Sequence, residues 1–154
     1  MTVYLRNTTR RHRLDLRAVE RAARRVLSAA GEPDATLSLS LVGDRAIRTL
    51  NRRHRGKDRA TDVLSFPLIE ARDERKGRNG ARAERMLGDV VISLDTARRQ
   101  AGAYDATLDA EVRRLLIHGV LHLLGHDHER PREGARMRAE ERRLATAIGL
   151  PWPY

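Results

Sequence analysis

The stretch from Ile117 to His128, IHGVLHLLGHDH, constrains this chain most, because it joins an apolar helical segment to four of the six histidines. His118 and His122 are four residues apart, so on a helix they lie one turn apart on the same face. Gly125 is where such a helix can end, because glycine adopts the left-handed conformation at a C-cap without a Cβ clash. The chain can then turn and bring His128 toward the other two, which predicts a metal site of three imidazoles.

His126 is the alternative third ligand, because it precedes His128 by two residues, although the register favours His128. Any one of these histidines could instead be a core residue bonded to a neighbour, but three at these offsets around a glycine indicate ligation. Zinc is the expected ion, and other divalent transition metals suit three imidazoles comparably. Asp127 is expected to orient a ligand or to fix the turn after Gly125.

Written out, HGVLHLLGHDH resembles the signature of the YbeY family of bacterial metal-dependent endoribonucleases. Two further segments match that family in order along the chain: RGKD at residues 55–58 running into TDVLSFP at 61–67, and GDVVIS at 88–93. The resemblance spans most of the chain. It implies a hydrolase acting in ribosomal RNA maturation and ribosome quality control, with the small ribosomal subunit or its associated proteins as partners.

Arg55 matches the functional arginine of that family, so the resemblance implies a catalytic role in binding phosphate and stabilising transition-state charge. Without the resemblance, a solvated loop residue is the plainer interpretation of Arg55. Lys57 and Arg59 are weaker candidates for contacts to an RNA backbone. Three polar residues are expected only to hold strand ends and loops near the site: Asp62, Ser65 and Asp89.

The histidine motif also favours one kind of chemistry. Three imidazoles leave one position of a tetrahedral ion for water, which is the arrangement of a catalytic zinc. Zinc proteases of the metzincin register, HExxHxxGxxH, carry a glutamate base directly after the first histidine. This chain shares that register, but Gly119 stands at the position of the base. A phosphodiester instead needs stabilisation of charge on its non-bridging oxygens, which a metal and an arginine supply. We therefore expect a single-strand-directed endoribonuclease rather than a peptidase.

Composition agrees with a polyanionic partner. The formal charge is +10, and 29 of the 31 basic residues are arginine, whose planar donors suit phosphate. Nucleic acid is favoured over a membrane surface, although an arginine-rich composition with a merely solvated surface is the alternative. With 3% aromatic residues, RNA would be read through its backbone and shape rather than by base stacking. The chain has no cysteine, signal peptide or membrane span, so we expect a cytoplasmic protein and a metal held by imidazole or carboxylate.

Apolar periodicity predicts strands near 3–7, 37–41, 62–66 and 87–94, and helices near 15–31, 44–51, 95–102, 108–124 and 131–148. The order indicates a single α+β domain over residues 1–154: a small mixed four-stranded sheet packed with helices, of which the metal-bearing helix is central. Asp44 and Asp95 are expected to cap the helices that they begin. Residues 70–85 are expected to form a mobile charged loop, and residues 151–154 a tail.

Two other functions stay open at this stage. A non-catalytic ribosome-assembly factor with a structural metal would need a fourth protein ligand, for which His126 or Asp127 is nearest. A metallohydrolase of another substrate, peptides included, would show activity that RNA does not affect.

Overall fold

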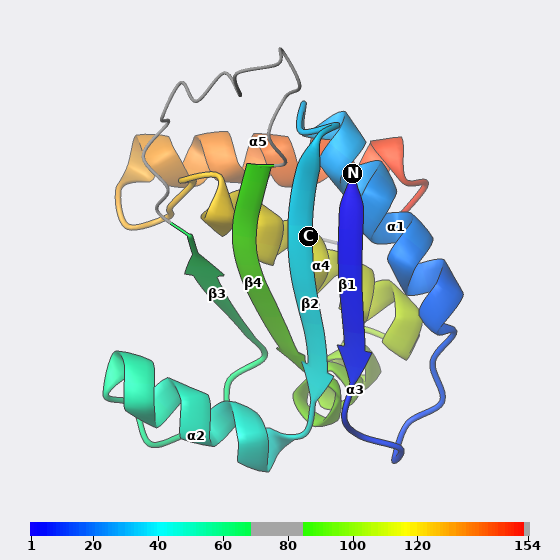
Figure 1. Cartoon of the computed structure of the whole chain (residues 1–154), viewed down its shortest axis with the longest axis vertical. Helices are drawn as coiled ribbons and strands as arrows, with labels where there is room; N and C mark the ends of the chain where they lie inside the picture. Colours follow the sequence, from blue (N-terminus) through cyan, green and yellow to red (C-terminus); the bar gives the residue numbers. More distant parts are fainter. Residues whose placement is uncertain (69–84, 153–154) are drawn as a thin grey trace, which may run out of the picture.

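The computed structural model describes residues 1–68 and 85–152 as a four-stranded sheet packed with helices (Figure 1). The mixed α+β architecture is the one expected from the sequence. In chain order the elements are β1 (Thr2–Asn7), α1 (Leu16–Ala29), β2 (Ala35–Val42), α2 (Asp44–Arg55), β3 (Val63–Pro67), β4 (Arg85–Ser93), α3 (Leu94–Ala103), α4 (Leu108–Leu123) and α5 (Pro131–Ala147).

The sheet has the strand order β1-β2-β4-β3. β1, β2 and β4 run parallel, and β3 pairs antiparallel to β4 (Figure 1). The carboxyl ends of the three parallel strands therefore meet at one edge, where α2 begins after β2 and α3 begins after β4. In open α/β sheets, this edge is the usual place for a binding crevice.

Two apolar clusters hold the layers together. The larger one joins one face of the sheet to α1, α3, α4 and α5. The smaller one, Val42, Ile47, Leu64 and Val91, lies beneath α2. On β4, Val91 belongs to the smaller cluster whereas Val90 belongs to the larger, so this strand is covered on both faces, as its unbroken apolar run predicted.

α4 is the central helix. Thr107 caps its first turn by accepting a hydrogen bond from the amide of Ala110 at 3.1 Å. Buried residues occur on every turn from Val112 to Leu123, because the helix packs against the sheet on one side and against α1, α3 and α5 elsewhere. This burial fixes the position and rotation of the segment that carries His118 and His122.

The prediction that Asp44 and Asp95 cap their own helices is wrong. Gly43 is the N-cap of α2 and Ser93 is the N-cap of α3. Each carboxylate instead accepts hydrogen bonds from groups at the start of the other helix. Asp95 accepts a hydrogen bond from the amide of Asp44 at 2.9 Å, and Asp44 accepts from the hydroxyls of Ser93 at 2.7 Å and Thr96 at 2.6 Å. The two helix starts lie at the same edge of the sheet, so each aspartate reaches the other helix.

Some boundaries also differ from expectation. α2 continues through Arg55, beyond the end expected near residue 51. Arg85, the last residue of the expected mobile loop, is the first residue of β4 and pairs with Glu32 at 2.6 Å; the rest of that loop, residues 70–84, lies outside the described residues. In the expected tail, Trp152 packs against the larger core, and residues 153–154 lie outside the described part. Within the described ranges, no helix has the length and apolar character needed to span a membrane.

Candidate metal centre

The structure brings His118, His122 and His128 together. The Nε2 atoms of His118 and His122 are 3.0 Å apart, and the ring of His128 lies with its centroid 5.9 Å from that of His118 and 5.4 Å from that of His122. Each residue offers one ligand atom, and these atoms lie within 4.8 Å of one another. Nitrogens at zinc distances of 2.0–2.1 Å in a tetrahedral site are about 3.3 Å apart. The cluster can therefore hold a metal ion, with only a small movement of the exposed His128 side chain.

The turn after α4 follows the prediction for Gly125, which has φ +93°. The amide of Gly125 donates to the carbonyl of His122 at 3.0 Å, and the amide of His126 donates to the carbonyl of Leu121 at 3.0 Å. This pair of bonds is a Schellman motif, which closes a helix and reverses the chain. The reversal returns His128 to the other two histidines, and His126 is not a member of the cluster among the described residues.

Glu141 is the polar contact that sequence reasoning missed. Its Oε1 lies 3.1 Å from Nδ1 of His118, and its side chain is only 13% exposed. A carboxylate in this position orients the ring and keeps Nε2 free to bind an ion. Glu141 lies on α5, 23 residues further along the chain, so no local motif points to it. Asp127 acts locally, since its Oδ1 accepts a hydrogen bond from the amide of His128 at 2.7 Å.

The surroundings of His122 favour its neutral form. Burial lowers its pKa below the ordinary value for histidine, and the neighbouring His118 adds to this effect. A lowered pKa favours the neutral imidazole, which is the form that binds metal.

The structure also explains the glycine at position 119. A Cβ at Gly119 would lie 2.7 Å from a methyl carbon of Val90 and 3.3 Å from the hydroxyl of Ser65. Position 119 therefore faces the sheet and has no room for a side chain. A glutamate base at this position of the chain would require Val90, Ser65 or α4 itself to shift.

Arg55 ends α2 and is joined to the same region. Its Nη2 donates to the carbonyl of Ser65 at 3.2 Å, and the hydroxyl of Ser65 donates to the carbonyl of Gly119 at 2.9 Å. Two hydrogen bonds thus connect Arg55, through β3, to the residue next to His118. Gly56 then closes α2 in the left-handed conformation, so the chain turns away directly after Arg55.

Lys57 and Arg59 follow that turn and are exposed. The buried side chain of Asn51 holds the turn by donating to the carbonyl of Arg59 at 2.9 Å. Asp62 fixes the start of β3, because its Oδ1 accepts from the amide of Val63 at 2.8 Å. No hydrogen bond or ion pair involving the side chain of Asp89 occurs within the described residues.

The fold and the histidine cluster together define a small α+β protein with a three-imidazole site suited to a metal ion. The chain belongs to the endoribonuclease YbeY family, whose family model matches residues 4–149. The expected family is thereby confirmed, and with it the expected class, an endoribonuclease.

Curated relatives agree. The chain is 62% identical to an endoribonuclease YbeY of Myxococcus xanthus over 114 residues, a match that covers 74% of this chain and 37% of that protein. It is 50% identical to an endoribonuclease YbeY of Anaeromyxobacter sp. over 150 residues, covering 97% of this chain and 73% of the relative. It is 42% identical to the Geobacter metallireducens protein of that name, covering 94% and 93%. A solution structure of a Thermotoga maritima protein, 23% identical, has the same fold, with a TM-score of 0.63 over 95% of this chain and 88% of that chain.

Proposed function

We propose that this protein is a zinc-dependent, single-strand-directed endoribonuclease that acts in the cytoplasm on ribosomal RNA, in its maturation and in ribosome quality control. The observation that carries the proposal is the three-histidine cluster on α4 in a chain that belongs to an endoribonuclease family. His118, His122 and His128 are the proposed ligands. The small ribosomal subunit or its associated proteins are the proposed partners.

A bound zinc ion would supply a Lewis acid and a water of lowered pKa beside the scissile phosphodiester. Glu141 would hold the ring of His118 so that its Nε2 faces the ion. Arg55 would bind a non-bridging oxygen of the phosphate and stabilise the charge that builds there. Its guanidinium has five donors, and the bond to Ser65 uses one of them, so a fork remains for phosphate.

Recognition of the strand would rest on charge. Lys57 and Arg59 are exposed beside Arg55, and both would contact the RNA backbone. Phosphate contacts of this kind release counterions, so RNA affinity should fall steeply with salt.

Two observations weigh against the alternative functions. Within residues 1–68 and 85–152 the metal cluster has three members, and neither His126 nor Asp127 supplies the fourth ligand that a structural site needs. Gly119, which packs against Val90, supplies no glutamate base of the kind that peptidases of this register use. Both observations support the nuclease proposal over an assembly factor or a peptidase.

The test is cleavage of ribosomal RNA by the purified chain, with and without a chelator, beside the variants His122→Ala and Arg55→Gln. Cleavage by the wild-type chain that all three perturbations stop, while circular dichroism shows the fold retained, supports the proposal. Equal cutting in every sample, or none even with ribosomes and zinc supplied, would favour the assembly-factor function. Cleavage of peptides that added RNA leaves unchanged would favour a different metallohydrolase.

A further inference from the structure

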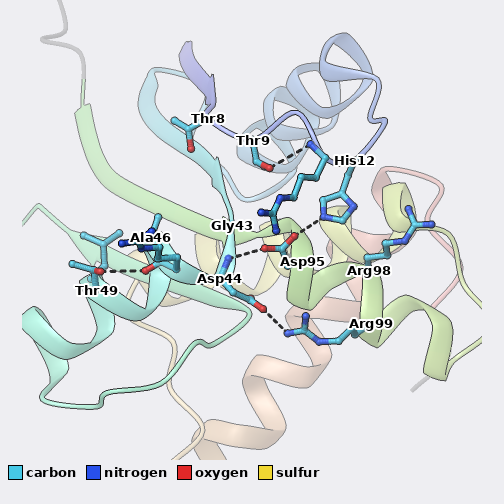
Figure 2. A pocket seen from close by; sticks show the side chains of 13 residues that line it. Thr8, Thr9, His12, Gly43, Asp44, Ala46, Thr49, Asp95, Arg98 and Arg99 are labelled. Carbon is cyan, nitrogen blue, oxygen red and sulfur yellow. Dashed lines mark hydrogen bonds and ion pairs between the residues drawn. The ribbon is translucent and has the colours of Figure 1, made fainter.

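A groove of about 1040 Å³ lies at the edge where the parallel strands end. Its walls come from the residues that follow those strands, including Thr8 after β1, Gly43 after β2 and Asp95 after β4 (Figure 2). None of the three clustered histidines lines it. The groove is therefore a second concave surface, separate from the candidate metal centre.

The groove has an excess of positive charge. Four arginines and two aspartates line it: Arg11, Arg45, Arg98, Arg99, Asp44 and Asp95. Both carboxylates already have partners. Asp44 pairs with Arg99 at 2.8 Å, and Asp95 contacts Nε2 of His12 at 2.6 Å (Figure 2).

The other three arginines, Arg11, Arg45 and Arg98, are exposed, and their side chains make no ion pair or hydrogen bond with any described residue. Three unpaired guanidinium groups around one groove can bind an anion with several oxygens, and phosphate matches their fork of donors. No Phe, Tyr or Trp lines the groove, and the one aromatic ring that does, His12, is only 11% exposed and is held by Asp95, so the groove offers little surface for base stacking. Its chemistry fits a phosphate rather than a base.

One face of α2 joins the groove to the proposed catalytic arginine. Arg45, Arg48, Arg52 and Arg55 follow one another at spacings of three or four residues and so form a stripe along the helix. Ten residues at a rise of 1.5 Å place the two ends of this stripe roughly 15 Å apart along the helix axis. Arg48 is paired with Asp58, at 2.9 Å, and the other three members have exposed side chains.

We propose that the groove binds a backbone phosphate of the RNA strand whose scissile phosphate lies at Arg55, a few nucleotides away. This inference rests on the proposed function, because the strand is the substrate of that site. The stripe on α2 favours RNA over an acidic peptide, since a polyphosphate chain can follow successive arginines from the groove to Arg55. The groove thus serves as a positioning subsite that is independent of base sequence.

The test compares two double variants of the full chain that lose the same charge. Arg45→Gln/Arg98→Gln removes two guanidinium groups from the groove. Arg21→Gln/Arg25→Gln removes two exposed arginines of α1, which line a different cavity. Binding of a fluorescent single-stranded RNA of twelve nucleotides and one of three nucleotides is measured across a salt series, with a chelator present so that neither RNA is cut.

We expect the groove variant to bind the long RNA more weakly, with a salt dependence reduced by about 0.7 in log–log slope for the one lost single-strand phosphate contact. The α1 variant should keep the wild-type slope, and the short RNA should not distinguish the groove variant from the α1 variant. Equal slopes for the two variants would overturn the proposal. So would a loss of affinity by the groove variant for an oligoglutamate peptide or inorganic phosphate but not for the long RNA.

The same RNA with a single neutral methylphosphonate, moved one position at a time, locates the contact. A methylphosphonate a few nucleotides from the cleavage site should weaken RNA binding by the wild-type chain. The same substitution should not weaken RNA binding by the groove variant. A uniform effect along the strand would contradict a fixed subsite. Because these measurements record binding, they separate this proposal from the nuclease proposal, which fails instead if the wild-type chain binds RNA and does not cut it.

Discussion

The hydroxyl of Ser65 donates a 2.9 Å hydrogen bond to the carbonyl oxygen of Gly119, so strand β3 contacts the metal-site helix at the one residue of its C-terminal half that lacks a side chain. The main-chain carbonyl of the same serine accepts a hydrogen bond from the guanidinium of Arg55. Close packing at Gly119 therefore determines how the proposed phosphate-binding group and the histidines are placed relative to each other.

Gly119→Ala should lower the free energy of unfolding by about 1–3 kcal/mol, the usual cost of overpacking a core. The added methyl group would lie 2.7 Å from Val90. Gly102→Ala is the matched control, because a Cβ at Gly102, which is also helical, has no neighbour within 4 Å. The control should be neutral or slightly stabilising. Urea denaturation of both variants measures the difference, and equal stabilities would contradict the packing argument.

Glu141→Gln should weaken zinc binding by about 10–100-fold, because the ring of His118 loses the carboxylate that orients it. Competition with a chromogenic chelator measures the affinity directly. Glu140→Gln is the control, since this neighbouring glutamate pairs with Arg143 at 2.7 Å and not with one of the three clustered histidines. Unchanged zinc affinity in Glu141→Gln would show that the contact is only structural.

Zinc at a hundred times its dissociation constant should stabilise the wild-type chain by about 2.7 kcal/mol, because the folded state alone presents the assembled site. Thermal unfolding with and without zinc records this gain. His122→Ala should lose most of it. Equal stabilisation of this variant would place the ion elsewhere.

Arg55→Gln should reduce the rate of RNA cleavage by about 10²–10³-fold, the usual effect of removing one group that stabilises transition-state charge. Arg55→Lys should restore only part of the rate, because an ammonium lacks the planar fork. Arg53→Gln, an exposed arginine in the same helical turn, serves as the control. If both glutamine variants lost activity equally, Arg55 would be acting through net charge alone.

Acid should destabilise the protein through Asp95 and Asp44. Hydrogen bonds from His12 and from the amide of Asp44 hold the pKa of Asp95 below its ordinary value of 3.8. For Asp44, partial burial acts to raise the pKa, but hydrogen bonds from Thr96, Ser93 and Arg99 outweigh it, and the pKa is again lowered.

A lowered folded-state pKa contributes stability that is present above the unfolded value and lost as pH falls through the folded value. The free energy of unfolding should therefore drop as pH falls below about 4–5. Asp95→Asn should be less stable than the wild-type chain at pH 7 and should lose less on acidification. Urea denaturation at a series of pH values measures the difference. If the free energy of unfolding changed with pH equally in the two proteins, Asp95 would not be a source of the acid sensitivity.

The local signals in the sequence were sufficient for much of the site. The i, i+4 spacing of His118 and His122 and the glycine at 125 depend on helix geometry alone, so the cluster could be predicted without a structure. Glu141 could not, because its contact with His118 depends on how α5 packs on α4. Similarly, nothing local links Arg55 to Ser65, since the packing of α2 on β3 and β4 through Ile47, Leu64 and Val91 brings them together.

The aspartate caps show the same limit more sharply. Ser, Thr and Asp are all favourable at an N-cap, so the residue types around position 95 could not separate Ser93 from Asp95. Tertiary packing determines which residue is the N-cap of α3, because Ser93 ends β4 and Asp95 is turned toward α2. The element order and the sheet strands were predictable from apolar periodicity, whereas the partners of polar side chains were not.

The exchange of carboxylates between α2 and α3 also determines how this edge of the molecule opens. The amide of Asp44 has its acceptor on α3, and the hydroxyls of Ser93 and Thr96 have theirs on α2. Unravelling the first turn of either helix therefore removes hydrogen-bond partners from the other, and the two turns form one cooperative unit. α2 looks peripheral in Figure 1, yet its start is tied to the end of a central strand. Arg55, at the other end of α2, is therefore carried by a helix whose first turn unfolds only together with the edge of the sheet.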